Sequence, residues 1–106
     1  MCLDLSQNAI GDSGADQLRT YLYKKSQIQD INIENNKLND KQIKKILTGV
    51  LHNNTVKKLN LSKNSITNAS CELISEIIYR KVNLRELYLH WNMIDHRGGN
   101  LIFNQL

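Results

Sequence analysis

A short pattern recurs four times along this 106-residue chain, and it constrains the fold more than any other feature. In its clearest copy, residues 59–66, apolar residues stand first, third and eighth, and an asparagine stands sixth. The other copies occupy residues 3–10, 31–38 and 87–94, so that successive copies start 28 residues apart without insertion or deletion. A fixed period of this length marks a repeat architecture. We expect a single domain over residues 1–106, with repeats at about 3–30, 31–58 and 59–86 and an incomplete repeat at 87–106.

Each repeat predicts one strand, one turn and one helix. In the second repeat, Ile31 and Ile33 alternate with polar residues, which is the period of a strand. Apolar residues then recur at helical spacing from Ile43 to Leu51, which predicts a helix with one buried stripe. Residues that commonly cap helices stand before the predicted helices. The expected caps are Gly11-Asp12-Ser13, Asn39-Asp40, Thr67-Asn68 and, in the fourth repeat, His96.

The stacking of these units predicts the fold class. One unit cannot shield its own inward leucines, whereas neighbouring units cover each other. We expect an α/β fold, a right-handed α/β solenoid in which parallel strands line a concave face and helices line the convex face. The apolar residues begin at Leu3, and the chain ends at Leu106 inside a predicted helix. Both ends of the stack are therefore expected to need a cover, either from neighbouring molecules or from a longer array of which this chain is a piece.

The pattern L-x-L-x-x-N-x-I/L at 28-residue intervals resembles the leucine-rich repeat family, ribonuclease-inhibitor-like subtype. The resemblance extends from Leu3 to Leu106. It implies a segment of a horseshoe with α-helices on the convex side. The resemblance indicates little about function, because members of the family mostly serve as scaffolds that bind varied partners.

One asparagine recurs at the sixth position of the pattern. It is either a polar stripe that binds a ligand or a structural element whose amides satisfy backbone groups at the bend after each strand. We favour the structural interpretation, and the resemblance implies the same asparagine ladder. The ladder residues are Asn8, Asn36, Asn64 and Asn92.

The outward strand positions form the predicted concave face. Small, polar or charged residues, such as Ser6 and Ser62, fill it in the first three repeats, whereas the fourth repeat carries large aromatic residues and the only tryptophan. Large aromatic side chains on a scaffold face are typical interface anchors. Alternatively, they cover the end of the sheet or pack on residues beyond Leu106. The candidate protein-binding residues are Asn32, Glu34, Asn60, Lys63, Tyr88, His90 and Trp91.

Composition argues against several other classes. The net charge of +4 is a mild excess of 14 basic over 10 acidic residues and does not call for nucleic acid. Lys41, Lys44 and Lys45, with Lys37 nearby, form a predicted convex patch that could face a nucleic acid or an acidic tail, but such a run is more often a solvated helix face. No apolar run approaches the ~20 residues needed to span a bilayer, so no membrane contact is expected.

No catalytic or metal-binding pattern stands out. His52, His90 and His96 do not lie near a serine or cysteine in a triad-like order, and no pair has ligand spacing. Gly98-Gly99 more simply permits close helix packing than phosphate binding. We expect no enzyme activity and no cofactor. Cys2 and Cys71 lie far apart, so we expect reduced thiols and an intracellular setting.

The sequence therefore predicts a non-catalytic interaction scaffold that binds other proteins through its concave face and exposed ends, within a larger complex. The block from Leu87 to Asn92, with Gly98-Gly99 and Ile102-Phe103, is similar to leucine-rich repeat proteins of ciliary axonemes. This favours a structural subunit in the cytoplasm or cytoskeleton, with the cilium or axoneme as a hypothesis. The alternative is a regulator, because the subtype includes GTPase-activating proteins. Inhibitors and innate-immune sensors form a third class, although such chains usually carry many more repeats.

Overall fold

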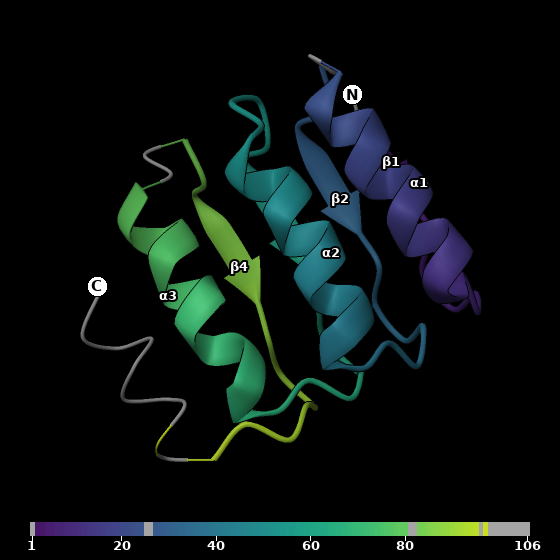
Figure 1. Cartoon of the computed structure of the whole chain (residues 1–106), viewed down its shortest axis with the longest axis vertical. Helices are drawn as coiled ribbons and strands as arrows, with labels where there is room; N and C mark the ends of the chain where they lie inside the picture. Colours follow the sequence, from purple (N-terminus) through teal and green to yellow (C-terminus); the bar gives the residue numbers. More distant parts are fainter. Residues whose placement is uncertain (1, 25–26, 81–82, 96, 98–106) are drawn as a thin grey trace.

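The computed structural model describes residues 2–24, 27–80, 83–95 and 97. Short strands alternate with helices along the chain (Figure 1). The elements are β1 (Cys2–Asp4), α1 (Gly11–Tyr23), β2 (Asp30–Asn32), α2 (Asp40–Leu51), β3 (Lys58–Asn60), the 3₁₀ turn η1 (Asn68–Ser70), α3 (Cys71–Arg80) and β4 (Glu86–Tyr88). The expected cap at His96, the pairs Gly98-Gly99 and Ile102-Phe103, and the predicted helix in which the chain ends lie outside the described residues.

The four strands form one parallel sheet in the order β1-β2-β3-β4. Partner residues are 28 apart throughout, as in the pairs Cys2 with Asp30 and Lys58 with Glu86. The ladder continues beyond the strands, since the Ile33 N–H donates to the Asn60 carbonyl at 3.0 Å. The expected α/β fold with parallel strands in the 28-residue register is confirmed.

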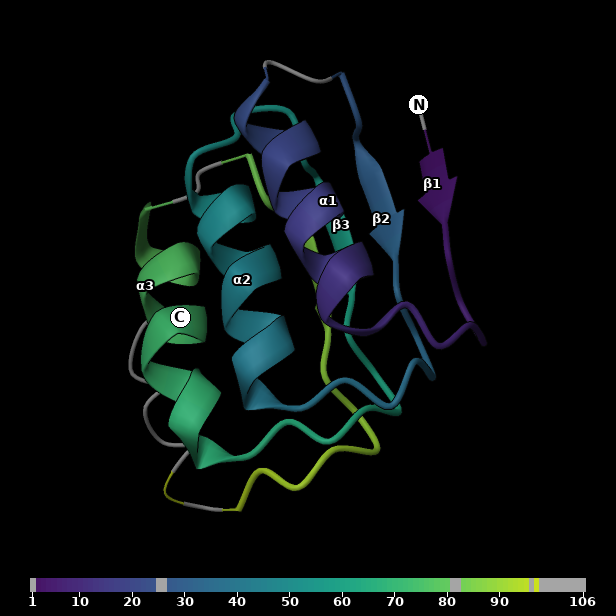
Figure 2. The same cartoon turned by 45° about the vertical axis from the view of Figure 1, so that its right-hand side comes forward.

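The helices lie side by side on one face of the sheet (Figures 1 and 2). No element in the described part of the chain covers the opposite face. We call this opposite face the open sheet face; it carries the residues for which the sequence predicts a concave surface.

The core lies between the sheet and the helices and is most complete in the two middle repeats. Ile31, Ile33, Leu59 and Leu61 are at most 1% exposed. Their counterparts in the outer repeats are only half-buried and pack against this cluster: Leu3, Leu5, Leu87 and Leu89. Each fully buried leucine or isoleucine contributes about 1.5–3 kcal/mol, so the middle repeats hold most of the hydrophobic stabilisation.

Two of the expected helix caps are correct and one is wrong. The Asn39 side chain accepts from the Gln42 N–H while the Gln42 side chain accepts from the Asn39 N–H, which is a capping box. Thr67 caps η1 through the Ala69 N–H. In the first repeat, however, the helix already begins at Gly11, so Asp12 and Ser13 lie inside its first turn and Ile10 stands at the N-cap without a side-chain bond.

Candidate functional site

The asparagine column links successive repeats at the bend that follows each strand. The Asn64 amide group donates to the carbonyls of Ile33 and Leu61, at 3.1 Å each. Its oxygen accepts from the N–H groups of Asn36 and Leu38, at 3.0 Å each. Because Asn64 is only 9% exposed, these bonds satisfy backbone groups that water does not reach. The side chain thus serves the stack rather than a ligand.

The other three asparagines repeat this arrangement in part. Asn92 accepts from the N–H groups of Asn64 and Ile66 and donates to the Leu61 carbonyl. Asn36 donates to the Leu5 carbonyl at 2.9 Å, but its own buried oxygen has no hydrogen-bond partner in the described part of the chain. Asn8 donates only within its own turn. The column is therefore complete between the middle repeats and incomplete in the first.

The residue before each of these asparagines adopts a left-handed backbone conformation. Gln7, Asn35, Lys63 and Trp91 have φ between +57° and +59°, a region that non-glycine residues rarely occupy. All four side chains are exposed, and Trp91 is 75% exposed. Trp91 thus shares the backbone conformation of its three equivalents and is the one aromatic residue among them.

A polar cluster occupies the middle of the open sheet face. The Glu34 carboxylate lies 3.3 Å from the Lys63 ammonium group and accepts a hydrogen bond from the Asn60 amide at 3.2 Å. The Asn32 side chain accepts from the Glu34 N–H. Four of the seven residues expected to bind a protein are therefore brought together and mutually bonded.

The aromatic residues of the fourth repeat form the second part of this face. The rings of Tyr88 and His90 meet edge to face with centroids 6.4 Å apart, and the Lys58 ammonium group lies 5.6 Å from the Tyr88 centroid. The Tyr88 hydroxyl donates to the Glu86 carboxylate at 2.8 Å. This hydrogen bond, and then the charge of Glu86, raise the pKa of Tyr88. Tyr88 is thus held by its neighbours, whereas the adjoining Trp91 ring is exposed.

A small hollow of about 210 Å³ opens between β1, β2 and β3. Its polar lining includes Asp4, Asp30 and Lys58. At its edge the Cys2 thiol donates to the Asp30 carboxylate at 3.2 Å, and this bond raises the pKa of Cys2. Hydrogen bonds from Ser6 lower the pKa of Asp4.

Ser62 shares the repeat position of Glu34 and His90 but is not exposed on the open sheet face. It is 0% exposed, and its hydroxyl donates to the Asn60 side-chain oxygen at 2.5 Å. The Asn60 oxygen also accepts from the Ser62 N–H, so the serine closes a local turn beneath its neighbour.

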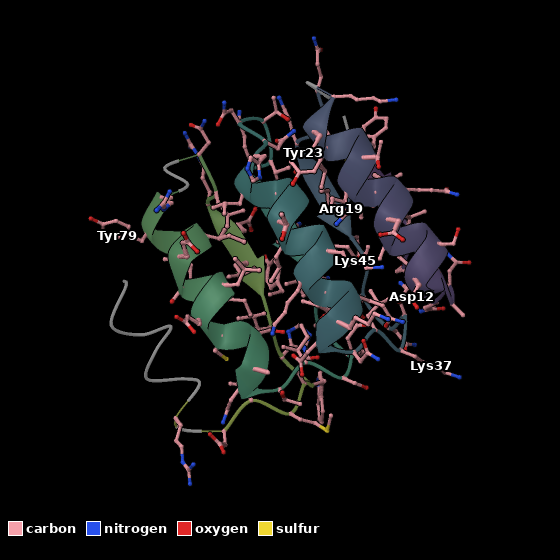
Figure 3. The ribbon with its side chains drawn as sticks, in the orientation of Figure 1. Asp12, Arg19, Tyr23, Lys37, Lys45 and Tyr79 are labelled. Carbon is pink, nitrogen blue, oxygen red and sulfur yellow. The ribbon has the colours of Figure 1, made fainter. Side chains whose placement is uncertain are left out.

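The lysines of α2 do not form a bare basic patch. The Lys45 ammonium group lies 3.1 Å from the Asp16 carboxylate of α1, and Lys41 lies 4.0 Å from Asp12. Figure 3 labels Lys45 on α2 and Asp12 on α1. Arg19 approaches the same Asp16 at 3.5 Å. Acidic residues of α1 thus face Lys41 and Lys45, which agrees with the solvated-face interpretation for these two lysines.

Three polar links between repeats escaped sequence reasoning. The Asp40 carboxylate accepts from the hydroxyls of Thr67 and Ser70 and from the Thr67 N–H at 3.1 Å. Asn68 and Asp95 bond to each other across the next repeat boundary. Asn53, only 4% exposed, donates to the Leu22 carbonyl of the first repeat at 3.4 Å. For Asp40 and Asn68 the signal was an Asp or Asn two residues after the apolar loop position, which also suits a helix cap.

A metal site, a membrane span and a disulfide would each require particular features in the described residues. His52 ends α2, where its ring nitrogen lies 2.9 Å from the Thr48 carbonyl. No three described His, Cys, Asp or Glu residues group as metal ligands, and no described helix has the length and apolar character of a membrane span. Both thiols are free: Cys2 is exposed and Cys71 is buried.

Known proteins share this architecture. A family model described as leucine rich repeat matches residues 1–18 and 52–75. A solved structure of the leiomodin-1 actin-binding site 2 superposes with a TM-score of 0.88 at 18% sequence identity. The superposition covers 98% of this chain, which spans 62% of that one. No protein of curated function matches the sequence. The matched repeats and the shared fold together support a leucine-rich repeat protein.

Proposed function

We propose that the chain is a protein-binding scaffold of the ribonuclease-inhibitor-like subtype and that its partner lies on the open sheet face. The observation that supports this most is the exposure of Trp91, 75% exposed on a scaffold whose other large apolar residues are mostly buried. A tryptophan contributes a large contact area at a small loss of conformational freedom. Burial of that ring requires a second surface.

The polar part of the same face suits recognition of a protein. Glu34, Lys63 and Asn60 are already bonded to each other, so a partner meets side chains that are largely ordered before binding. Side chains that are ordered in advance lose less entropy on association. Polar groups around an aromatic anchor are also the usual anatomy of an interface.

The charges on the open sheet face favour a partner whose contacting surface is basic. The outward strand positions carry four carboxylates and two ammonium groups in the described residues, although the whole chain has a net charge of +4. The carboxylates are Asp4, Asp30, Glu34 and Glu86, and the ammonium groups are Lys58 and Lys63. Complementary charge chiefly speeds association and sets specificity.

Site-specific photo-crosslinking tests this function. A photoreactive amino acid replaces Asn60 or His90 on the open sheet face, or Lys44 or Tyr79 on the helix side, and each variant is exposed to lysate of the source cells. We expect the two sheet-face positions to capture the same protein and the two helix-side positions to capture none of it. Capture from the helix side alone would reject the open sheet face as the site.

Two purified candidates extend the same experiment. Actin is the first, because the structural relative is described as an actin-binding site. A small GTPase, assayed for GTP hydrolysis with and without the chain, tests the regulatory alternative. Crosslinking to actin through Asn60 or His90 would name the partner, and accelerated hydrolysis would favour a GTPase-activating role over a purely structural one.

The cellular setting that we propose is a larger assembly, with the ciliary axoneme as the specific hypothesis. Its support is the likeness of the block Leu87–Asn92 to axonemal leucine-rich repeat proteins. Expression of a tagged chain in the source cells, with detergent extraction of cilia, tests it. Enrichment in the extracted axoneme is expected, and a tag found only outside cilia would reject the hypothesis.

A further inference from the structure

The turn between β1 and α1 differs from the two turns that are equivalent to it. In the second and third repeats, the residue before the helical turn is extended: Asn39 has φ −93° and ψ −179°, and Thr67 has φ −114° and ψ −175°. The equivalent residue in the first repeat is Gly11, whose φ is +63° and which is already part of α1. The first helix therefore begins one residue earlier in the repeat than α2 does.

The apolar residue of this turn packs against the core but is less buried than its equivalents. Leu38 and Ile66 are 0% exposed at this repeat position, whereas Ile10 is only half-buried. Beside Ile10 lies a hollow of about 370 Å³ at the β1 side of the stack. Its lining is mostly apolar: Leu3, Leu5, Ile10, Leu18, Tyr21 and Ile28.

The same difference explains the missing bond in the asparagine column. The Asn64 oxygen accepts from the N–H groups of Asn36 and Leu38. The 28-residue register assigns the N–H groups of Asn8 and Ile10 to the Asn36 oxygen, but neither bond is formed. Asn36 is 2% exposed, and a buried acceptor without a partner destabilises the state that contains it.

Two glycines permit this conformation. Gly11 adopts the positive φ at little steric cost. At residue 14, a Cβ would lie 2.5 Å from the Ile10 Cβ, so any other residue would displace Ile10. The equivalent positions in the next repeats are Gln42 and Ser70, and neither of those turns is open.

We propose that residues 8–14 form a two-state plug. In the second state, Gly11 is extended, Ile10 enters the hollow as Leu38 and Ile66 enter their repeats, and the Asn8 and Ile10 amides donate to the Asn36 oxygen. The open state gains a helical residue at the start of α1. The closed state fills apolar space and satisfies a buried oxygen.

Two substitutions that copy the third repeat test the proposal. Gly11→Thr copies Thr67: a β-branched residue disfavours positive φ, and its hydroxyl caps the helix once the residue is extended. Gly14→Ser copies Ser70 and removes the space that Ile10 uses. Ser13→Ala, at an exposed position of the same helical turn, is the control.

Amide hydrogen exchange and relaxation dispersion by NMR are the measurements. In the wild type we expect millisecond exchange broadening confined to residues 8–14. Gly11→Thr and Gly14→Ser should suppress it and slow the exchange of the Asn8 and Ile10 amides by up to about tenfold, the effect of one hydrogen bond. Ser13→Ala should change neither quantity.

One outcome of these exchange measurements would contradict the proposal. If the Asn8 and Ile10 amides exchange as in the wild type in Gly11→Thr while the Ile33 amide keeps its protection, the closed state does not exist. Outside its two chain neighbours, a Cβ at residue 11 would meet no atom within 4 Å, so Gly11→Thr decides the question even if Gly14→Ser unfolds α1.

Discussion

At the scale of single residues, short polar side chains that join one repeat to the next stabilise this fold. The asparagine column was predictable, because the same amide side chain recurs in all four repeats at the bend where backbone groups need partners. The Asp40 link was not, because an Asp beside a helix start looks like a cap and its partners Thr67 and Ser70 lie about 30 residues away. Exposure on the open sheet face was not predictable from the repeat alone, since Ser62 is 0% exposed and bonded to Asn60 whereas His90 at the same repeat position is exposed.

Asn64→Leu should lower the free energy of unfolding by about 1–3 kcal/mol, because it leaves buried N–H groups of Asn36 and Leu38 without an acceptor. Urea denaturation followed by circular dichroism measures this. The control is Asn8→Leu at the exposed end of the same column, with an expected effect within about 0.5 kcal/mol. Equal losses in the two variants would mean that the column acts through local turns and not between repeats.

The Asp40 carboxylate should make the free energy of unfolding depend on pH in the acid range. Burial alone would raise the pKa of Asp40, but the hydrogen bonds from Ser70 and Thr67 outweigh it and lower the pKa in the folded state. The stabilisation from this carboxylate is therefore full above the unfolded-state pKa of about 3.9 and disappears as pH falls through the folded-state pKa.

Urea denaturation of wild type and Asp40→Asn across the acid range tests this. The stability difference between them should be largest near neutral pH and shrink on acidification. The matched control is Asp12→Asn at the equivalent position of the first repeat, where the exposed ion pair with Lys41 predicts a much smaller loss of stability. A difference for Asp40→Asn that is independent of pH would show that the ionised carboxylate is not what stabilises the link.

At the scale of elements, periodicity predicted every described strand and helix, and the inward residues of the middle repeats are buried as expected. The start of α1 was wrong for a local reason. Gly11 and Gly14 allow a turn that Asn39 with Gln42, and Thr67 with Ser70, do not adopt. The repeat pattern treats Gly11 and Gly14 as equivalent to the residues at the same positions in the other repeats. It therefore does not reveal a conformation that requires glycine at both positions.

The capping box of α2 should make a measurable contribution to the free energy of unfolding. Asn39→Ala is expected to cost about 1 kcal/mol of unfolding free energy, because the Gln42 N–H loses its side-chain acceptor at the helix start. Ser13→Ala in the first turn of α1 caps nothing and should change stability by less than about 0.5 kcal/mol. Thermal and urea unfolding of both variants compare them directly; equal effects would contradict the assignment of the cap.

At the scale of the whole molecule, the stack is best covered in its middle and least covered at its outer repeats. Hydrogen exchange should reveal this gradient. The Leu5, Ile33 and Leu61 amides occupy one repeat position and each donates to the next repeat, so their hydrogen bonds match. We expect Ile33 to be the most protected and Leu5 the least, because stability in a stack of repeats is summed over neighbours. Equal protection of the three amides would mean that the chain unfolds as one unit without fraying.

The 28-residue pattern was sufficient to predict this architecture, whereas the partner could not be predicted because the outward residues obey no period. Their variation from repeat to repeat is what specificity needs, and it leaves no pattern within one sequence. Tyr88, His90 and Trp91 stood out only as bulky aromatic residues in an otherwise small and polar series.

The central claim is that the open sheet face binds a protein through Trp91. The most direct measurement is the affinity of Trp91→Ala for the protein captured through Asn60 or His90, by isothermal titration calorimetry. The matched control is Tyr79→Ala on α3, since Tyr79 is 73% exposed and Trp91 is 75% exposed. We predict a loss of at least about 2 kcal/mol, roughly thirtyfold in Kd, for Trp91→Ala, with no change for Tyr79→Ala and an unchanged unfolding midpoint in both. Unchanged affinity in Trp91→Ala, or an equal loss in Tyr79→Ala, would contradict the claim.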